Sequence, residues 1–118
     1  MININIENEY SRLKIVILGI ANNLGDPPTE SDAYDPRSLY HIKNNSYPIE
    51  DDLLREVDSF YNKLIKHNVE VIRPTNINNC NQIFARDLGF VISNLFFLSN
   101  IVPNRNYELK GIDDILKN

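Results

Sequence analysis

The stretch "PIEDDLLREVDSFYNKLIKHNVEVIRP", Pro48 to Pro74, decides the fold because it contains a complete helix followed by a strand. Its apolar residues recur at helical spacing and form one stripe, which predicts an amphipathic helix over residues 48–67. Acidic residues begin this helix and basic residues end it, as the helix dipole favours, and Asn68 suits a left-handed stop. The alternating run that follows predicts a strand over residues 69–73.

A second strand is predicted upstream of the helix. The run "RLKIVILG" predicts a strand over residues 12–19 that is buried on both faces, and its final Gly19 permits a turn. Strand, helix and strand together predict a parallel βαβ unit with a right-handed crossover. The sequence therefore belongs to the α/β fold class.

A long polar segment with three prolines separates the first strand from the helix. Residues 20–47 show no sustained periodicity and are predicted to form a flap-like loop. Loops of this length in a compact domain are usually functional, disordered or host to a short helix. Thr29 to Tyr34 is the candidate for one turn of helix.

Downstream, the stretch "NQIFARDLGFVISNLFFLSNIVPNR", Asn81 to Arg105, predicts a hairpin over residues 83–101. Its two strands are joined by Ser93-Asn94, which is compatible with a two-residue turn. The last run, "GIDDILKN", predicts the start of a helix within residues 105–118.

Composition limits the possible function classes. The chain has 118 residues, 42% of them hydrophobic and 24% charged, as in one ordinary globular domain or part of one. Its net charge of −4 and scattered basic residues argue against nucleic acid and favour a positively charged ligand. No apolar run is long enough for a membrane span and the first residues lack the layout of a secretory signal, so a cytoplasmic protein is expected.

Few residues in this sequence suggest catalysis or metal binding. The single cysteine, Cys80, excludes an internal disulfide and a multi-cysteine metal site. It would be a nucleophile only beside a base, and neither His41 nor His67 is close in sequence, so a loop or core cysteine is the favoured interpretation. The run "GIANNLG", Gly19 to Gly25, matches neither phosphate-binding glycine motif. No metal and no cofactor are predicted.

Two charged pairs lie at the predicted hairpin, Arg86-Asp87 at the mouth of its first strand and Arg105-Glu108 just past its second, and each has two interpretations. Arg86 and Asp87 form either a water-exposed ion pair or the entrance to a pocket in which Asp87 receives a cation. Arg105 and Glu108 are either surface charges at a helix start or part of the same pocket, with Arg105 binding a substrate carboxylate. In the second case, Asp87 and Arg105 would hold a molecule with a guanidinium at one end and a carboxylate at the other.

The run "NQIFARDLGFVISNLFFLSNIVPNRNYELKGI" resembles the N-terminal portion of the pentein superfamily. This superfamily comprises amidinotransferases, arginine deiminases and dimethylarginine dimethylaminohydrolases. The resemblance lies in an Arg-Asp pair, a following hairpin and an Arg-x-x-Glu beyond it, and the order of the earlier loop, helix and strand is similar. It implies a partial α/β-propeller built of ββαβ modules, of which this chain would supply about two of five.

The resemblance also implies site residues. Asp87 would bind the guanidinium of the substrate, and Arg105 would be a carboxylate-binding or pocket-rim residue. Leu24 and Asp26 would lie in a flap over the site. An arginine-like small molecule is the implied partner.

The chain departs from the family in its catalytic residues. The family attacks the guanidinium carbon with a late cysteine assisted by a histidine and a carboxylate, and no residue of this chain stands in those contexts. We therefore expect an N-terminal part of a guanidino-group-modifying enzyme, by hydrolysis or amidine transfer, that supplies substrate-binding residues and is inactive alone. The alternatives are a non-catalytic small α/β module that self-associates as a homo-oligomer or binds a small cation, and an unrelated α/β domain.

Overall fold

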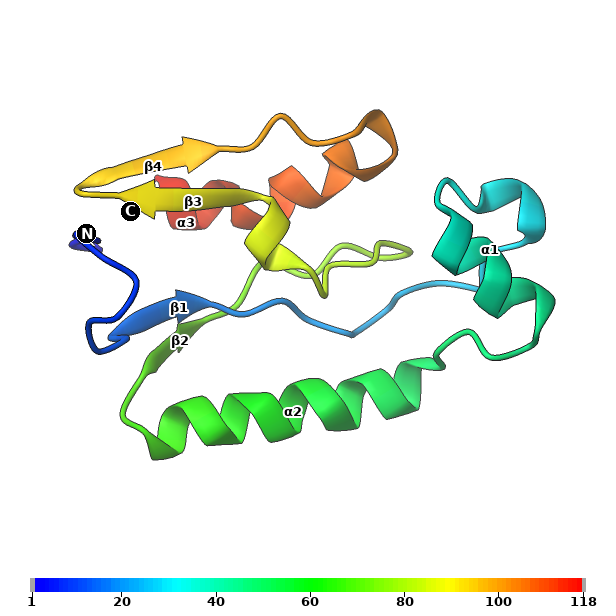
Figure 1. The fold of residues 1–118 in the computed structure, drawn as a ribbon, viewed down its shortest axis with the longest axis horizontal. Helices are drawn as coiled ribbons and strands as arrows, with labels where there is room; N and C mark the ends of the chain where they lie inside the picture. The colour runs from blue at the N-terminus through cyan, green and yellow to red at the C-terminus, as the bar shows by residue number, and fades with distance from the viewer. Residues whose placement is uncertain (1, 118) are drawn as a thin grey trace.

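The computed structural model describes residues 2–117, which form a small mixed α/β domain with two small sheets (Figure 1). The strands are β1 (Ile15–Ile17), β2 (Glu70–Ile72), β3 (Gly89–Ile92) and β4 (Leu95–Leu98). The α-helices are α1 (Pro36–Lys43), α2 (Glu50–Lys66) and α3 (Asp113–Leu116). The 3₁₀ helices are η1 (Glu30–Asp32), η2 (Ala85–Asp87) and η3 (Pro103–Ile112). The predicted α/β class is confirmed.

The βαβ unit forms as predicted. β1 and β2 are paired in parallel, and α2 connects them. The helix predicted over residues 48–67 is confirmed within two residues at each end. Asn68 ends it with a φ of 56°, in the left-handed region. The strands predicted over residues 12–19 and 69–73 are confirmed in their central residues.

α2 lies along the β1–β2 pair and buries the small apolar core of the domain (Figure 1). Leu18, Leu64 and Val69 are its buried members. Half-buried side chains pack around them: Val16, Val57, Tyr61 and Val71. The prediction that the first strand is buried on both faces is wrong, because β1 is only half-buried in a sheet of two strands.

The segment of residues 20–47, predicted as a flap-like loop, contains two short helices. η1 lies within Thr29 to Tyr34, which confirms the turn of helix expected there. The prediction does not include α1. This helix begins at a capping signal, since the Asp35 side chain accepts two backbone N–H bonds at 2.9 and 3.0 Å and Pro36 occupies the first turn.

β3 and β4 form a hairpin around the predicted turn, Ser93-Asn94, in which Ser93 has a φ of 51°. The predicted extent, residues 83–101, is too long, because regular pairing is confined to β3 and β4. η2 replaces the first part of the predicted strand. Ala85 and Leu88 are both buried and three residues apart, a spacing that places them on one side of a 3₁₀ turn.

A close backbone contact joins the segment that follows β1 to the segment that precedes η2. The Ile20 N–H donates to the Gln82 carbonyl at 3.1 Å. Gly19 lies against the Ile83 carbonyl, so that any Cβ at this position would collide with backbone. Gln82 is buried, and its side-chain amide bonds two backbone groups of the segment 75–77. This contact sets where the chain leaves β2 and turns toward the hairpin.

The C-terminal part of the described chain is helical, as predicted for residues 105–118. The helix begins earlier, at Pro103, and is of the 3₁₀ type through η3 before α3 continues it. Residue 118 lies outside the described residues. None of the helices formed by residues 2–117 is long and apolar enough to cross a membrane.

Candidate functional site

η2 positions Asp87. The Asp87 N–H donates to the Phe84 carbonyl at 3.0 Å and the Leu88 N–H donates to the Ala85 carbonyl at 3.1 Å, which closes a 3₁₀ turn. The expectation that Asp87 lies at the mouth of a strand starting at Ile83 is therefore corrected. The turn separates Asp87 from β3 and leaves its carboxylate half-exposed.

η3 positions Arg105 and Glu108. The two residues are three apart, so they project from the same side of a 3₁₀ helix. The Nε and Nη2 groups of Arg105 donate to the two carboxylate oxygens of Glu108 at 2.6 and 2.7 Å. Glu108 is only 4% exposed. The pair is thus a bidentate ion pair largely removed from water, and the interpretation of these residues as surface charges is wrong.

Arg105 also joins Asp87 to this pair. Its Nη1 donates to Asp87 Oδ2 at 2.8 Å. We call Asp87, Arg105 and Glu108 the charged cluster. The cluster has two carboxylates for one guanidinium, and the nearby Arg86 contacts Asp87 Oδ1 at 3.4 Å with a side chain that is 84% exposed. Because water screens so exposed a charge, the cluster keeps an excess of negative charge.

The carboxylates hold Arg105 in its charged form and occupy most of its donors. The hydrogen bond to Glu108 raises the pKa of Arg105, burial lowers it, and the bond to Asp87 raises it further. A longer contact at 3.4 Å reaches the Phe84 carbonyl. Among residues 2–117, protein groups thus use four of the five guanidinium hydrogens, and one hydrogen on Nη1 remains. The role of Arg105 in binding a substrate carboxylate stays a prediction, with that single donor available.

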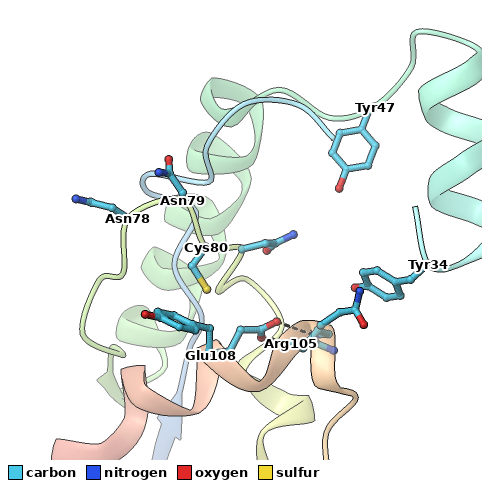
Figure 2. A pocket seen from close by; sticks show the side chains of 10 residues that line it. Tyr34, Tyr47, Asn78, Asn79, Cys80, Arg105 and Glu108 are labelled. Carbon is cyan, nitrogen blue, oxygen red and sulfur yellow. Dashed lines mark hydrogen bonds and ion pairs between the residues drawn. The ribbon is translucent and has the colours of Figure 1, made fainter. Parts of the chain in front are cut away.

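A cavity of about 510 Å³ lies beside the charged cluster (Figure 2). Arg105 and Glu108 form part of its wall, whereas Asp87, which was expected to receive a cation inside a pocket, lies outside this wall. The other lining residues come from the long loop, the Asn-rich segment after β2 and the start of η3: Tyr34, Tyr47, Asn78, Asn79, Cys80, Asn81, Asn104 and Tyr107. Aromatic rings, amides and an ion pair make this a lining for a polar or cationic guest.

Cys80 lies in the wall of this cavity, and Figure 2 shows its sulfur pointing toward Arg105 and Glu108. Burial raises the pKa of the Cys80 thiol and Glu108 raises it further, while Arg105 acts in the opposite direction. The reactive form of cysteine is the thiolate. This environment therefore disfavours a nucleophilic role for Cys80.

Leu24 and Asp26, the predicted flap residues, lie outside the cavity wall. Glu50 accepts two backbone N–H bonds from this part of the loop, one of them from Leu24 at 3.0 Å, and so anchors the loop to the start of α2. The adjacent Gly25 has a φ of 89° and lies against Asn79, which does line the cavity. The predicted site residues of the loop are thus next to the cavity wall, and their role as a flap stays a prediction.

The two histidines lie away from the cavity lining. His41 Nδ1 is 2.9 Å from the Ser46 hydroxyl, and its ring contacts Tyr40 edge-on. His67 caps the C-terminal end of α2. Within residues 2–117, no group of three or more His, Cys, Asp or Glu side chains is arranged to hold a metal ion.

The structure thus brings together two of the four predicted site residues, Asp87 and Arg105, across eighteen positions of sequence. Glu108 stands out in the sequence by its spacing from Arg105, but its burial and its position beside Cys80 do not. The cavity tyrosines carry no such signal. Tyr34 and Tyr47 flank α1 in the long loop, and nothing in their local sequence indicates that they line the same cavity as Cys80.

Comparison with known proteins adds no relative to these observations. No family model matches the chain, and no curated protein matches it closely enough to count as related. The charged cluster and the adjacent cavity are therefore interpreted from their own geometry.

Proposed function

We propose that the chain is the N-terminal part of a guanidino-group-modifying enzyme of the pentein type. Its contribution is to bind the guanidinium of an arginine-like substrate, and the reaction is hydrolysis or transfer of the amidine group. The chain itself provides no nucleophile and requires no cofactor for this binding. The charged cluster is the site that supports the proposal.

One observation carries the proposal: Asp87 already accepts a hydrogen bond from a guanidinium group, that of Arg105, at 2.8 Å. A carboxylate has about four acceptor positions on its two oxygens. Asp87 Oδ1 faces Arg86 at 3.4 Å, and an ion pair with so exposed a partner contributes little. A ligand guanidinium can therefore displace Arg86 and bind Oδ1 while Arg105 keeps Oδ2.

The electrostatic balance supports a cationic ligand. The charged cluster holds one more carboxylate than guanidinium, and the whole chain has a net charge of −4. A ligand guanidinium restores neutrality at Asp87, and its planar N–H groups match a carboxylate. A neutral urea group of the same shape, as in citrulline, gains no such charge compensation.

The architecture is compatible with a partial α/β-propeller. A hairpin and a parallel strand pair with its crossover helix are the elements that ββαβ modules require; here the parallel pair comes first and the hairpin follows it, as at the junction of one module with the next. This order supports the interpretation of the chain as about two of five modules.

The environment of Cys80 supports the proposal that this chain binds the substrate and does not catalyse its reaction. Attack on a guanidinium carbon requires a thiolate beside a base. Burial and Glu108 raise the pKa of Cys80, and neither histidine lines the cavity. We therefore expect no citrulline or ornithine production from arginine by this chain alone.

A second candidate is a non-catalytic α/β module that binds a small cation. The tyrosines of the cavity favour it, because aromatic rings bind cations through their faces. An assay of the full-length gene product for citrulline or ornithine separates the candidates. Production of either one supports the enzyme, and arginine binding without turnover supports the non-catalytic module.

Calorimetric titration with arginine and with citrulline tests the proposed binding. We expect arginine to bind and citrulline to bind at least tenfold more weakly, because hydrogen bonds to charged groups contribute about 1.5–3 kcal/mol. Asp87→Asn should weaken arginine binding at least tenfold for the same reason. Asp58→Asn, which makes the same charge change at an exposed position of α2, is the matched control and should bind as the unmodified protein does.

Arg86→Gln sharpens this test. Removing the exposed competitor from Asp87 Oδ1 should strengthen arginine binding, whereas a site elsewhere on the chain would gain little from the change. Equal arginine affinity in the Asp87→Asn and Asp58→Asn variants, or no binding in any of them, would remove Asp87 from the proposed role.

A further inference from the structure

The proposed guanidinium site makes no use of the cavity beside it, because Asp87 lies outside the cavity wall. The cavity volume of about 510 Å³ is within the range of about 300–1,000 Å³ that small-molecule sites occupy. Two separate parts of the chain enclose it. Figure 2 shows Tyr34 and Tyr47, from the long loop, across from Glu108 on η3. A ligand in the cavity would therefore bridge the long loop and η3.

The charges of the cavity wall cancel. Arg105 and Glu108 are its charged members, and two hydrogen bonds of 2.6 and 2.7 Å pair them with each other. The other lining residues are tyrosines, asparagines and Cys80. An ion in the cavity would give up water without meeting an uncompensated opposite charge, which is costly. The wall therefore favours a neutral guest.

The tyrosine rings do not reverse this preference. Lys110 Nζ already lies 4.2 Å from the centroid of the Tyr107 ring, so a second cation at that ring would meet a like charge. Tyr34 is 61% exposed, and cation–π contacts at exposed rings are weak. The rings can instead pack against the C–H groups of a neutral molecule, since their faces are large and apolar.

The polar groups of the wall are largely unused by the protein. Among residues 2–117, no hydrogen bond involves the side-chain amides of Asn78, Asn79 and Asn104 or the hydroxyls of the three lining tyrosines. Asn81 uses only Oδ1, which accepts the Ile83 N–H at 3.2 Å. Amides and hydroxyls each provide donors and acceptors together. The part of the lining that residues 2–117 form includes no aliphatic side chain, so the matching guest is rich in hydroxyl groups.

We propose that the cavity binds a small neutral saccharide, with the tyrosine rings against its C–H groups and the asparagine amides on its hydroxyls. This site goes beyond the guanidinium site and does not depend on it. Hydrogen bonds between neutral groups replace bonds to water at small net gain, so we expect a dissociation constant on the order of 1 mM. Because the ligand bridges the long loop and η3, its binding should also slow amide exchange in α1.

A nuclear magnetic resonance titration of the whole chain tests the proposal. D-glucose, D-galactose and maltose are each added to about 20 mM, well above the expected constant. At least one of them should shift the backbone amide signals of residues 78–81 and 104–108 together with those of Tyr34 and Tyr47. Choline and adenosine are the cationic and the planar aromatic probes. The proposal is overturned if no saccharide shifts these signals, or if choline or adenosine shifts them at lower concentration than every saccharide does.

Two variants with matched controls locate the site. Tyr47→Ala should raise the dissociation constant about fivefold, whereas Tyr40→Ala, at an exposed position of α1 outside the wall, should not change it. Asn104→Leu covers the case in which Tyr47→Ala disturbs the loop. It keeps the side-chain size and should raise the constant about threefold, and Asn106→Leu on the same helix is its control. Equal affinity in these two leucine variants, or displacement of the saccharide by arginine, would assign the binding elsewhere and overturn the proposal.

Discussion

The two strand pairs of this molecule have similar apolar sequences and opposite surroundings. The β1–β2 pair packs against α2, which buries Leu18, Leu64 and Val69 in one small core. Among residues 2–117, no such helix covers the face of the β3–β4 pair on which Phe90, Ile92, Leu95 and Phe97 are exposed. Apolar content alone therefore does not decide burial. The difference comes from the crossover helix, which a parallel pair requires and a hairpin does not.

The two regions also differ in what holds them to the rest of the chain. Apolar packing holds the β1–β2 region together. At the base of the hairpin, the charged cluster ties η2 to η3 through Asp87, Arg105 and Glu108. The same cluster carries the proposed binding site. The region with the weaker packing is thus the one that carries the proposed binding site, and the predictions below test that division.

The largest effect is expected from Arg105→Met. It leaves the carboxylate of Glu108 buried without its partner, which should lower the free energy of unfolding by about 3–5 kcal/mol. Arg55→Met is the control, because it removes the partner of Asp52 at an exposed site and should cost less than about 1 kcal/mol. Urea unfolding followed by circular dichroism measures both. If Arg105→Met and Arg55→Met lowered the free energy of unfolding by similar amounts, the charged cluster would be no more stabilising than an exposed ion pair.

The next effect concerns the apolar core. Leu64→Ala should lower the free energy of unfolding by about 2–5 kcal/mol, because it leaves a cavity between α2 and the strands. Leu95→Ala makes the same change at an exposed position of β4 and should cost about 0.5 kcal/mol. Urea unfolding followed by circular dichroism compares the two variants. A loss at Leu95 as large as that at Leu64 would mean that the hairpin is packed in solution.

A smaller effect is expected in the reactivity of Cys80. Burial and Glu108 raise the pKa of its thiol, so its alkylation by iodoacetamide at pH 8 should be slower than that of a short cysteine peptide. The rate should increase with pH through a midpoint above about 8.5, the ordinary value. Glu108→Gln removes the negative charge and should lower the midpoint. Alkylation as fast as that of the peptide would show that the thiol is activated, and would reopen a catalytic role for Cys80.

The smallest effect lies outside both sheets, at the start of α1. Hydrogen bonds from the Ser38 side chain and backbone and from the Arg37 backbone lower the pKa of Asp35 below 3.8. Its stabilisation of α1 is therefore present above pH 3.8 and is lost as the pH falls through the lower folded-state value. Amide exchange should show α1 opening at acid pH before α2 does. Asp35→Ala should open α1 at neutral pH, and unchanged protection in this variant would contradict the cap.

The sequence predicted well those features that depend on neighbouring residues. The apolar stripe of α2 and the Ser93-Asn94 turn each depend on residues only a few positions apart, and the structure has both. The α1 helix was also signalled locally, by Asp35 before Pro36, but the density of prolines around it favoured a loop. η2 depends on more distant residues, because Ala85 and Leu88 turn inward only where the rest of the chain covers them.

Part of the candidate site could also be predicted, because residue type and nearby sequence can be recognised without knowing the fold. Asp87 and Arg105 were singled out by their types and their places around the hairpin. The burial of Glu108, the direct bond between Asp87 and Arg105, and the cavity beside Cys80 depend on how η2, η3 and the Asn-rich segment meet. The way these segments meet is fixed by contacts such as that of Gly19 with the Ile83 carbonyl. These two residues are more than sixty positions apart in the chain.

The sequence by itself therefore determined the helix α2, the parallel strands around it, the hairpin turn and the acid and arginine on either side of the hairpin. Periodicity and turn chemistry act within a few residues, so they can be recognised without knowing the fold. Only the tertiary structure decided that Arg105 binds both Asp87 and Glu108 and that apolar side chains of the hairpin such as Phe90 are exposed among residues 2–117. Burial and ion pairing depend on which distant segments meet, and no local pattern contains that information.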